Sequence, residues 1–139
     1  MNDNIKQFIN SHARNKLIAA KQPIDNINHI NVGKVLSERI NEFIGNKKLS
    51  LNAKIELDEI LNSNVAYSDD IGKYLAIQNL GILFEPELKT DFVQLLDKYS
   101  SSNTLFVRWE GEIEDGILYF LTKEKGQKID IKNLSHIVI

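Results

Sequence analysis

Apolar side chains recur at intervals of three and four residues in several stretches of the chain, the spacing that places them on one face of an α-helix. These stretches predict helices over 3–12, 33–44, 53–62 and 85–99. Asn52 is the expected cap of the third helix, and Glu85-Pro86 is expected to start the fourth, because proline in a first turn loses no hydrogen bond. The third helix is expected to pack through Ile55, Leu57, Ile60 and Leu61, and the fourth through Leu88, Phe92, Leu95, Leu96 and Tyr99.

Shorter apolar runs predict strands at 17–20, 30–32, 74–77, 104–107 and 137–139, and the segment 63–73 is expected to be a loop. The strand at 74–77, the helix that follows it and the strand at 104–107 together take up roughly 35 residues, the size of a βαβ unit. Such a unit implies a parallel strand pair with a right-handed crossover.

The C-terminal part of the chain has a different pattern. Asp115-Gly116 predicts a hairpin turn between 108–110 and 117–121, and Gly126 marks a further turn. We therefore expect an α/β fold: a mixed sheet with a parallel βαβ centre, an antiparallel C-terminal hairpin at its edge, and helices on the faces. The length of 139 residues fits a single domain covering 1–139.

Composition narrows the possible partners. The chain has 17 Lys and Arg against 19 Asp and Glu, so no overall field draws it to nucleic acid or to an anionic membrane. It has no cysteine, which excludes disulfides and thiolate zinc sites and fits a reducing compartment. Neither a secretory signal nor an apolar run of about 18 residues is present, so we expect a cytoplasmic protein without a membrane span.

The strand at 74–77 ends on Gln78-Asn79, where a nucleotide hydrolase usually carries the aspartate of a Walker B motif. A neutral amide gives Mg²⁺ no anionic ligand, so these residues are expected simply to end a buried strand. A phosphate-binding loop needs the pattern G-x-x-x-x-G-K-[ST]. The chain has two Gly-Lys pairs, Gly33-Lys34 and Gly72-Lys73, and neither has the preceding glycine or the following hydroxyl. We therefore expect no ATP, no metal and no other cofactor, and no catalytic residue.

The remaining candidate residues give no stronger signal for chemistry. The acidic residues Glu110, Glu112, Glu114 and Asp115 are expected to form a solvated hairpin tip, and His12, His29 and His136 lack metal-binding spacing. The C-terminal lysines, Lys123, Lys125, Lys128 and Lys132, are mixed with acids, so we expect no direct nucleic-acid binding. Arg108-Trp109 suits either hairpin packing or a hot spot for a protein partner.

One family pattern covers roughly residues 16–121. The stretch LAIQNLGILFEPELKTDFVQLLDKYSSSNTLFVRWEGEIEDGILYF resembles the Walker B half of BrxF, the small P-loop ATPase-like subunits of BREX-type bacterial antiphage systems. INVGKVLSERI resembles the strand and helix that follow the phosphate loop in that family. The matching positions are Asn79, Phe84, Pro86, Leu88, Lys89, Trp109 and Gly111.

The chain departs from the same pattern at its chemical positions. Gln78 replaces the aspartate, Glu110 replaces a proline, and Ser101 and Asn103 stand where arginines are expected. KQPIDNINH lies where the phosphate loop would be. Because the groups that bind and hydrolyse ATP are missing together, the resemblance implies a degenerate P-loop-NTPase-like fold and not an active ATPase.

The resemblance implies a pseudoenzyme: a non-catalytic, ATPase-like interaction subunit of a bacterial antiphage defence complex, with larger protein components as partners. The expected partner-binding residues are Phe84, Glu85, Glu87, Lys89, Arg108 and Trp109. Two alternatives remain. One is a small phage-borne or immunity-type regulator that inhibits a partner protein, and the other is a metal-dependent nuclease that uses the acidic hairpin with Glu85 or Glu87.

Overall fold

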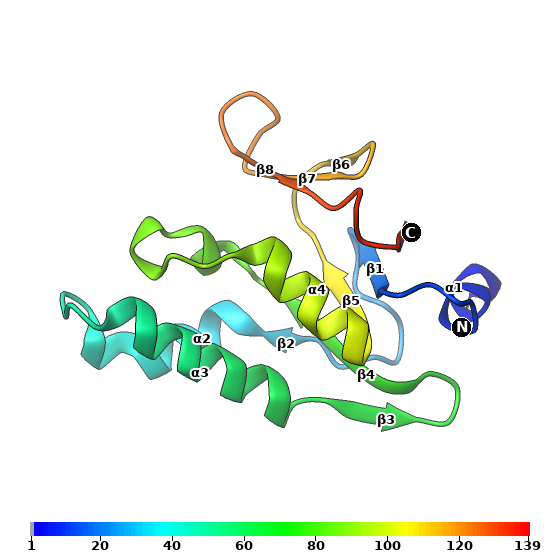
Figure 1. Ribbon diagram of the computed structural model, residues 1–139, viewed down its shortest axis with the longest axis horizontal. Coiled ribbons are helices and arrows are strands. Elements are labelled where there is room, and N and C mark those ends of the chain that lie inside the picture. The colour runs from blue at the N-terminus through cyan, green and yellow to red at the C-terminus, as the bar shows by residue number, and fades with distance from the viewer. Residues whose placement is uncertain (1) are drawn as a thin grey trace.

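The computed structural model describes residues 2–139 and has a sheet of five parallel strands at its centre (Figure 1). In order across the sheet the strands are β2 (Ile30–Asn31), β4 (Gly72–Gln78), β5 (Thr104–Arg108), β1 (Lys16–Ala20) and β9 (His136–Val138). Leu105 of β5 pairs with Leu17 of β1 on one side and with Leu75 of β4 on the other. The α/β fold with a parallel centre is confirmed.

Helices cover the two faces of this sheet unequally. The larger face packs against α2 (Val32–Ile40), α3 (Leu49–Ser63) and α4 (Phe92–Ser102), while the other packs against the short α1 (Asp3–Ile9) and the segment 21–29. Alternate strand residues serve the two faces, as the two-residue period of a strand requires. On β5, for example, Leu105 belongs to the larger cluster and Phe106 to the smaller one.

The predicted βαβ unit is confirmed: β4 and β5 are parallel neighbours and α4 connects them. The start of its helix was predicted wrongly. Pro86 begins a 3₁₀ helix, η3 (Pro86–Leu88), which ends at Lys89 in the left-handed region with φ 53°. The α-helix then begins at Phe92, because the Asp91 side chain accepts a hydrogen bond from the Gln94 amide at 3.0 Å. The predicted apolar stripe is buried throughout its length.

The C-terminal hairpin forms with the predicted turn, in which Asp115 and Gly116 both have positive φ, as a type I′ turn requires. Its first strand was predicted wrongly at 108–110, because Arg108 still belongs to β5 and the strand before the turn covers only 113–114. Its strands β6 (Ile113–Glu114) and β7 (Ile117–Phe120) join β8 (Gln127–Asp130) in a separate antiparallel sheet. The hairpin is therefore not an edge of the main sheet. The antiparallel strand of the main sheet is instead β3 (Ala66–Ser68), in a segment predicted to be a loop.

Two details of α3 also differ from the prediction. The helix begins at Leu49, so Asn52 lies inside it and does not cap it. Ile55 is 54% exposed, whereas Leu57, Ile60 and Leu61 are buried as predicted. None of the helices described within residues 2–139 is long and apolar enough to cross a membrane.

Candidate functional site

The carboxyl ends of β1, β4 and β5 lie side by side, and this carboxyl edge is where open α/β sheets usually bind ligands. The register pairs Ala20 with Arg108, while Gln78 follows Ile77, the last residue of β4 that pairs with β5. Asn31 at the end of β2 pairs with Gln78. The four strand ends therefore bring together residues that are far apart in the sequence.

Gln78 contacts Arg108 at this edge. The Arg108 Nη1 atom lies 3.5 Å from Gln78 Oε1 and 3.6 Å from a carboxylate oxygen of Glu110. The Arg108 Nε atom is buried and has no hydrogen-bond partner among the described residues. Gln78 thus places a neutral amide beside a fixed positive charge, which disfavours a cation at this point of the edge.

The Gly33-Lys34 pair has a structural role at the same edge. The Gly33 amide donates a hydrogen bond of 2.8 Å to the Asn79 carbonyl, and Asn79 Nδ2 donates to Asn31 Oδ1 at 2.7 Å. A Cβ atom on Gly33 would lie 2.8 Å from that carbonyl oxygen and 2.7 Å from Nδ2. Asn31 also accepts from the Lys34 amide and caps α2. The glycine is therefore required for close packing of α2 against the end of β4.

His29 lies beside this group, although the sequence gave no reason to place it there. Burial lowers the pKa of His29, and the nearby Arg108 charge lowers it further, while a 3.1 Å contact between Nδ1 and the Ile27 carbonyl opposes both effects. The ring is therefore neutral near pH 7.

The end of β1 shows how the edge is closed. The Ala20 carbonyl accepts a 2.7 Å hydrogen bond from the Trp109 amide, and the Ala19 carbonyl accepts from the Ile139 amide at 2.9 Å. Residues 21–29 form no helix after β1, and Ile24 and Ile27 of this segment pack on the smaller hydrophobic face. The segment covers the sheet, whereas a phosphate loop would present a row of amides at a helix start.

The predicted partner-binding residues fall into separate places. Trp109 is only 3% exposed, and it packs edge-on against Phe84 at 5.8 Å between ring centroids. Phe84 stacks in turn on Phe120 at 4.4 Å, and Trp109 Nε1 donates to the Tyr119 carbonyl. This aromatic cluster attaches the small sheet to the main one. Trp109 therefore serves the core, and a partner cannot reach it directly.

The charged residues among the predicted partner-binding residues differ in exposure. Glu85, Glu87 and Lys89 are exposed on and around η3, while Arg108 is half-buried at the carboxyl edge. Since neighbouring residues of a strand point to opposite faces, Arg108 and Trp109 do not form one surface.

The acidic hairpin is partly neutralised by one lysine. Lys123 pairs with Glu112 and Glu114, and the hydrogen bond that Lys123 donates to Glu114 is the main cause that raises the pKa of Lys123. Within residues 2–139, no group of three or more His, Asp or Glu side chains is placed to hold a metal ion. The geometry gives the nuclease alternative no supporting observation.

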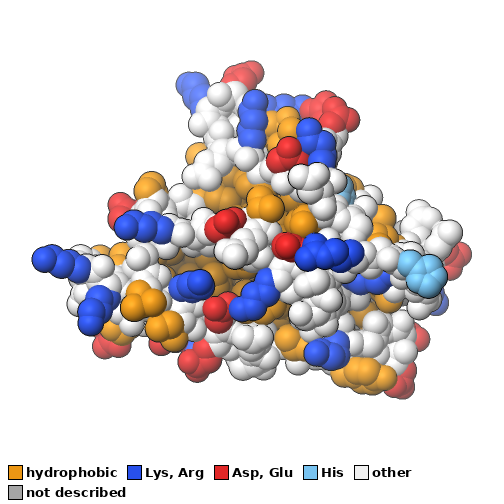
Figure 2. Space-filling view, viewed as in Figure 1, with side chains coloured by type: hydrophobic (Ala, Val, Ile, Leu, Met, Phe, Trp, Pro, Cys, Tyr) orange, Lys and Arg blue, Asp and Glu red, His pale blue; other side chains and the backbone are white. Residues whose placement is uncertain are grey.

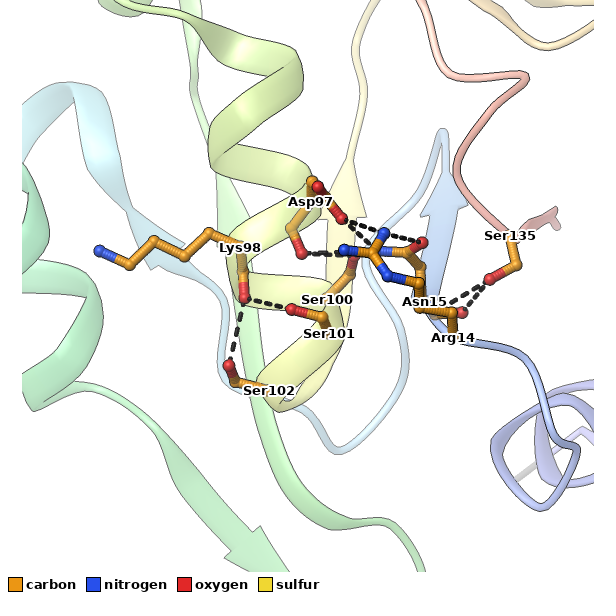
Figure 3. Close-up of polar contacts among 8 residues, drawn as sticks. All are labelled: Arg14, Asn15, Asp97, Lys98, Ser100, Ser101, Ser102 and Ser135. Atoms are coloured by element: carbon orange, nitrogen blue, oxygen red, sulfur yellow. Dashed lines mark hydrogen bonds and ion pairs between the residues drawn. The ribbon is translucent and has the colours of Figure 1, made fainter.

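A polar cluster that was not predicted lies at the amino end of β1, opposite the carboxyl edge (Figure 3). Asn15, 1% exposed, donates through Nδ2 to Asp97 Oδ1 and to Ser100 Oγ, each at 2.9 Å. Ser135 bonds both the amide and the carbonyl of Asn15. The hydrogen bond from Asn15, followed by those from Arg14, lowers the pKa of Asp97. Because Asn15 bonds to both neighbours, the cluster fixes α4 and the approach to β9 against β1.

Two hollows open beside α4. The larger, of about 660 Å³, lies between α3 and α4, and Figure 2 shows hydrophobic atoms in a recess on this face. The smaller, of about 450 Å³, lies between η3 and β8 and includes Phe84, Glu85 and Lys89 among its lining. Lys89 lines both hollows, so one predicted partner-binding residue stands between the two concave surfaces.

Comparison with models of protein families, with curated proteins and with solved structures finds no match for this chain.

Proposed function

We propose that this chain is a non-catalytic, ATPase-like interaction subunit of a bacterial antiphage defence complex. The proposal starts from the resemblance to BrxF and predicts that the chain acts by binding larger protein components. The single observation that carries it is the closed carboxyl edge, where Gln78 contacts Arg108 and the Gly33 amide is bonded to Asn79. Groups that an ATPase would direct at phosphate and Mg²⁺ are here directed at each other.

The first test is the response to nucleotide. A site filled at about 100 times its Kd adds about 2.7 kcal/mol to the free energy of unfolding. For a chain of this size that increment raises the melting temperature by roughly 5–10 °C. We expect Mg-ATP to change the melting temperature by less than about 1 °C, and an ordinary shift of several degrees would overturn the proposal.

The second test is made in the native host with phage plating. Deleting the gene is expected to raise the efficiency of plating, and both the wild-type gene and Gln78→Ala are expected to restore protection. The variant Lys89→Glu, which reverses one exposed charge at the end of η3, is expected to fail. Unchanged plating on deletion would refute the defence role, and a Gln78→Ala protein that folds but gives no protection would refute the non-catalytic role.

A further inference from the structure

We propose that the hollow between α3 and α4, called here the α3–α4 groove, binds an amphipathic helix of a partner protein whose apolar face is flanked by carboxylates. The proposal rests on the interaction role proposed above, and it specifies both the surface and the chemistry of the partner. The α3–α4 groove consists of a leucine floor, formed by Leu57, Leu88 and Leu95, and a rim that includes Leu51, Lys54 and Lys89.

The floor and part of the rim are apolar. The three floor leucines come from α3, η3 and α4 and are between 5% and 8% exposed, so helix packing holds them in place. Leu51 on the rim is 55% exposed and extends the apolar surface outward along α3. An exposed leucine next to a concave apolar floor is typical of a protein interaction surface.

Three polar side chains inside the groove contact one another. Tyr99 donates its hydroxyl to Asp58 at 2.8 Å, and burial together with this carboxylate raises the pKa of Tyr99. Lys98 lies 3.5 Å from the same carboxylate. The apolar face of a bound helix leaves this network intact.

The charges around the groove favour an acidic partner. Asp91 caps α4 and Asp97 pairs with Arg14, so these acids are engaged within the chain. Lys54 on the α3 wall and Lys89 beside α4 form no ion pair with any residue described in 2–139. The two lysines therefore stand on either side of the leucine floor. Figure 2 shows both Lys or Arg and Asp or Glu side chains bordering the recess, and the acids Asp91 and Asp97 of the lining are the engaged ones.

The dimensions fit a helix. With a rise of about 1.5 Å per residue, α4 provides a wall roughly 16 Å long and α3 a longer one. Anchors at positions i, i+4 and i+7 of a bound helix span about 10 Å. The groove can thus hold three apolar anchors, while glutamates beside the stripe reach the lysines of each wall.

The test uses two designed helical peptides and the full-length protein. One peptide carries leucines at i, i+4 and i+7 flanked by glutamates, and the other has lysine in place of each glutamate. Fluorescence anisotropy is expected to give a Kd below about 1 mM for the acidic peptide and binding at least about tenfold weaker for the basic one.

Protein variants then locate the site. Lys54→Glu with Lys89→Glu is expected to weaken the acidic peptide at least about tenfold and to strengthen the basic one. The matched double variant, Lys73→Glu with Lys125→Glu, changes the net charge equally at exposed positions outside the groove and is expected to bind like the wild type. Circular dichroism and urea unfolding check that all variants fold.

Three results would overturn the proposal: no binding of the acidic peptide, equal binding of both peptides, or equal effects of the two double variants. A concentration-dependent dimer abolished by Leu51→Glu would also overturn it, because a second copy of the chain would then fill the groove. A melting shift with Mg-ATP instead refutes the proposed function, and it does so without involving either peptide.

Discussion

Replacing Gln78 by glutamate tests the interpretation of the carboxyl edge most directly. The substitution keeps the shape of the side chain and adds a charge beside Arg108, whose side chain is 28% exposed. If the edge is a closed contact, the new carboxylate pairs with the guanidinium and the protein becomes more stable. If the edge is a metal site that has lost one ligand, the new carboxylate gains affinity for Mg²⁺ instead.

The size of the effect follows from the geometry. Nη1 and Oε1 lie 3.5 Å apart. At that separation two unit charges attract by about 5 kcal/mol with an effective dielectric constant near 20. Desolvation and competition from Glu110, which lies 3.6 Å from the same Nη1 atom, offset most of this attraction. A hydrogen bond from Arg108 to a charged carboxylate is stronger than one to the neutral amide of Gln78. We therefore expect a net gain of about 1 kcal/mol in the free energy of unfolding.

Urea unfolding at two pH values measures this gain. With an m-value of about 2 kcal/mol/M, the midpoint of Gln78→Glu is expected to rise by about 0.5 M at pH 7. The pairing lowers the pKa of the new carboxylate below about 4.3, so the gain is present above that pH and is lost as the pH falls through the lowered pKa. A double-mutant cycle with Arg108→Gln should remove the gain at pH 7.

Two outcomes would refute this reasoning. A variant less stable than the wild type at pH 7 would show that the contact is not available to a carboxylate. A melting temperature that rises with 10 mM MgCl₂ in the variant and not in the wild type would show that a metal site had been restored.

Three further predictions concern residues around the edge. Gly33→Ala should lower the free energy of unfolding by about 1–3 kcal/mol, because its Cβ would clash with Asn79. The control Gly81→Ala, whose Cβ would meet the Phe120 ring only at 3.5 Å, should lower it by less than about 1 kcal/mol. Urea unfolding compares the two variants. Trp109→Phe should cost about 1–3 kcal/mol in the same assay, because it leaves a buried carbonyl without its donor. His29 should titrate below 6.5 by NMR. The free energy of unfolding should therefore fall as the pH drops below 6.5, and less so in His29→Gln.

The sequence predicted most of the main sheet because its strands are short, apolar and bounded by polar residues. The pattern of β4, α4 and β5 was strong enough to give both the elements and their parallel pairing. It did not show the break between Pro86 and Phe92, because Leu88 continues the helical spacing while belonging to a separate 3₁₀ turn. The left-handed conformation of Lys89 carries no residue signal comparable to a glycine.

The place of the hairpin could not be predicted from local pattern. Its turn follows from Asp115-Gly116, but the sheet it joins is decided by tertiary contacts of Trp109 with the aromatic cluster. Gly111 allows the chain after Trp109 to approach β7 closely, since a Cβ on Gly111 would lie 2.1 Å from the Tyr119 carbonyl oxygen. The missed strand β3 had one usable signal, Gly72, whose positive φ lies at the end of the β3–β4 turn.

The site was only partly predictable for a similar reason. Gln78 and Asn79 were correctly placed at a strand end, because the apolar run before them fixes that end. Their partners Arg108 and Gly33 come from other elements, and no local period connects them. Trp109 was included in the expected partner surface but is buried, and the sequence could not show this because the same aromatic character suits a core and an interface equally well.

The closed edge and the α3–α4 groove are built by different parts of the molecule, so the absence of nucleotide chemistry that we propose for the edge does not require the loss of the groove. The edge depends on side chains at strand ends, where single replacements such as a glutamine for an acid change the chemistry. The groove depends on α3 and α4, whose positions are set by leucines buried against the sheet, including Leu57 and Leu95. Gln78 and Arg108 lie outside that packing, so under the function proposed above a chain without nucleotide chemistry still presents a rigid surface to a partner.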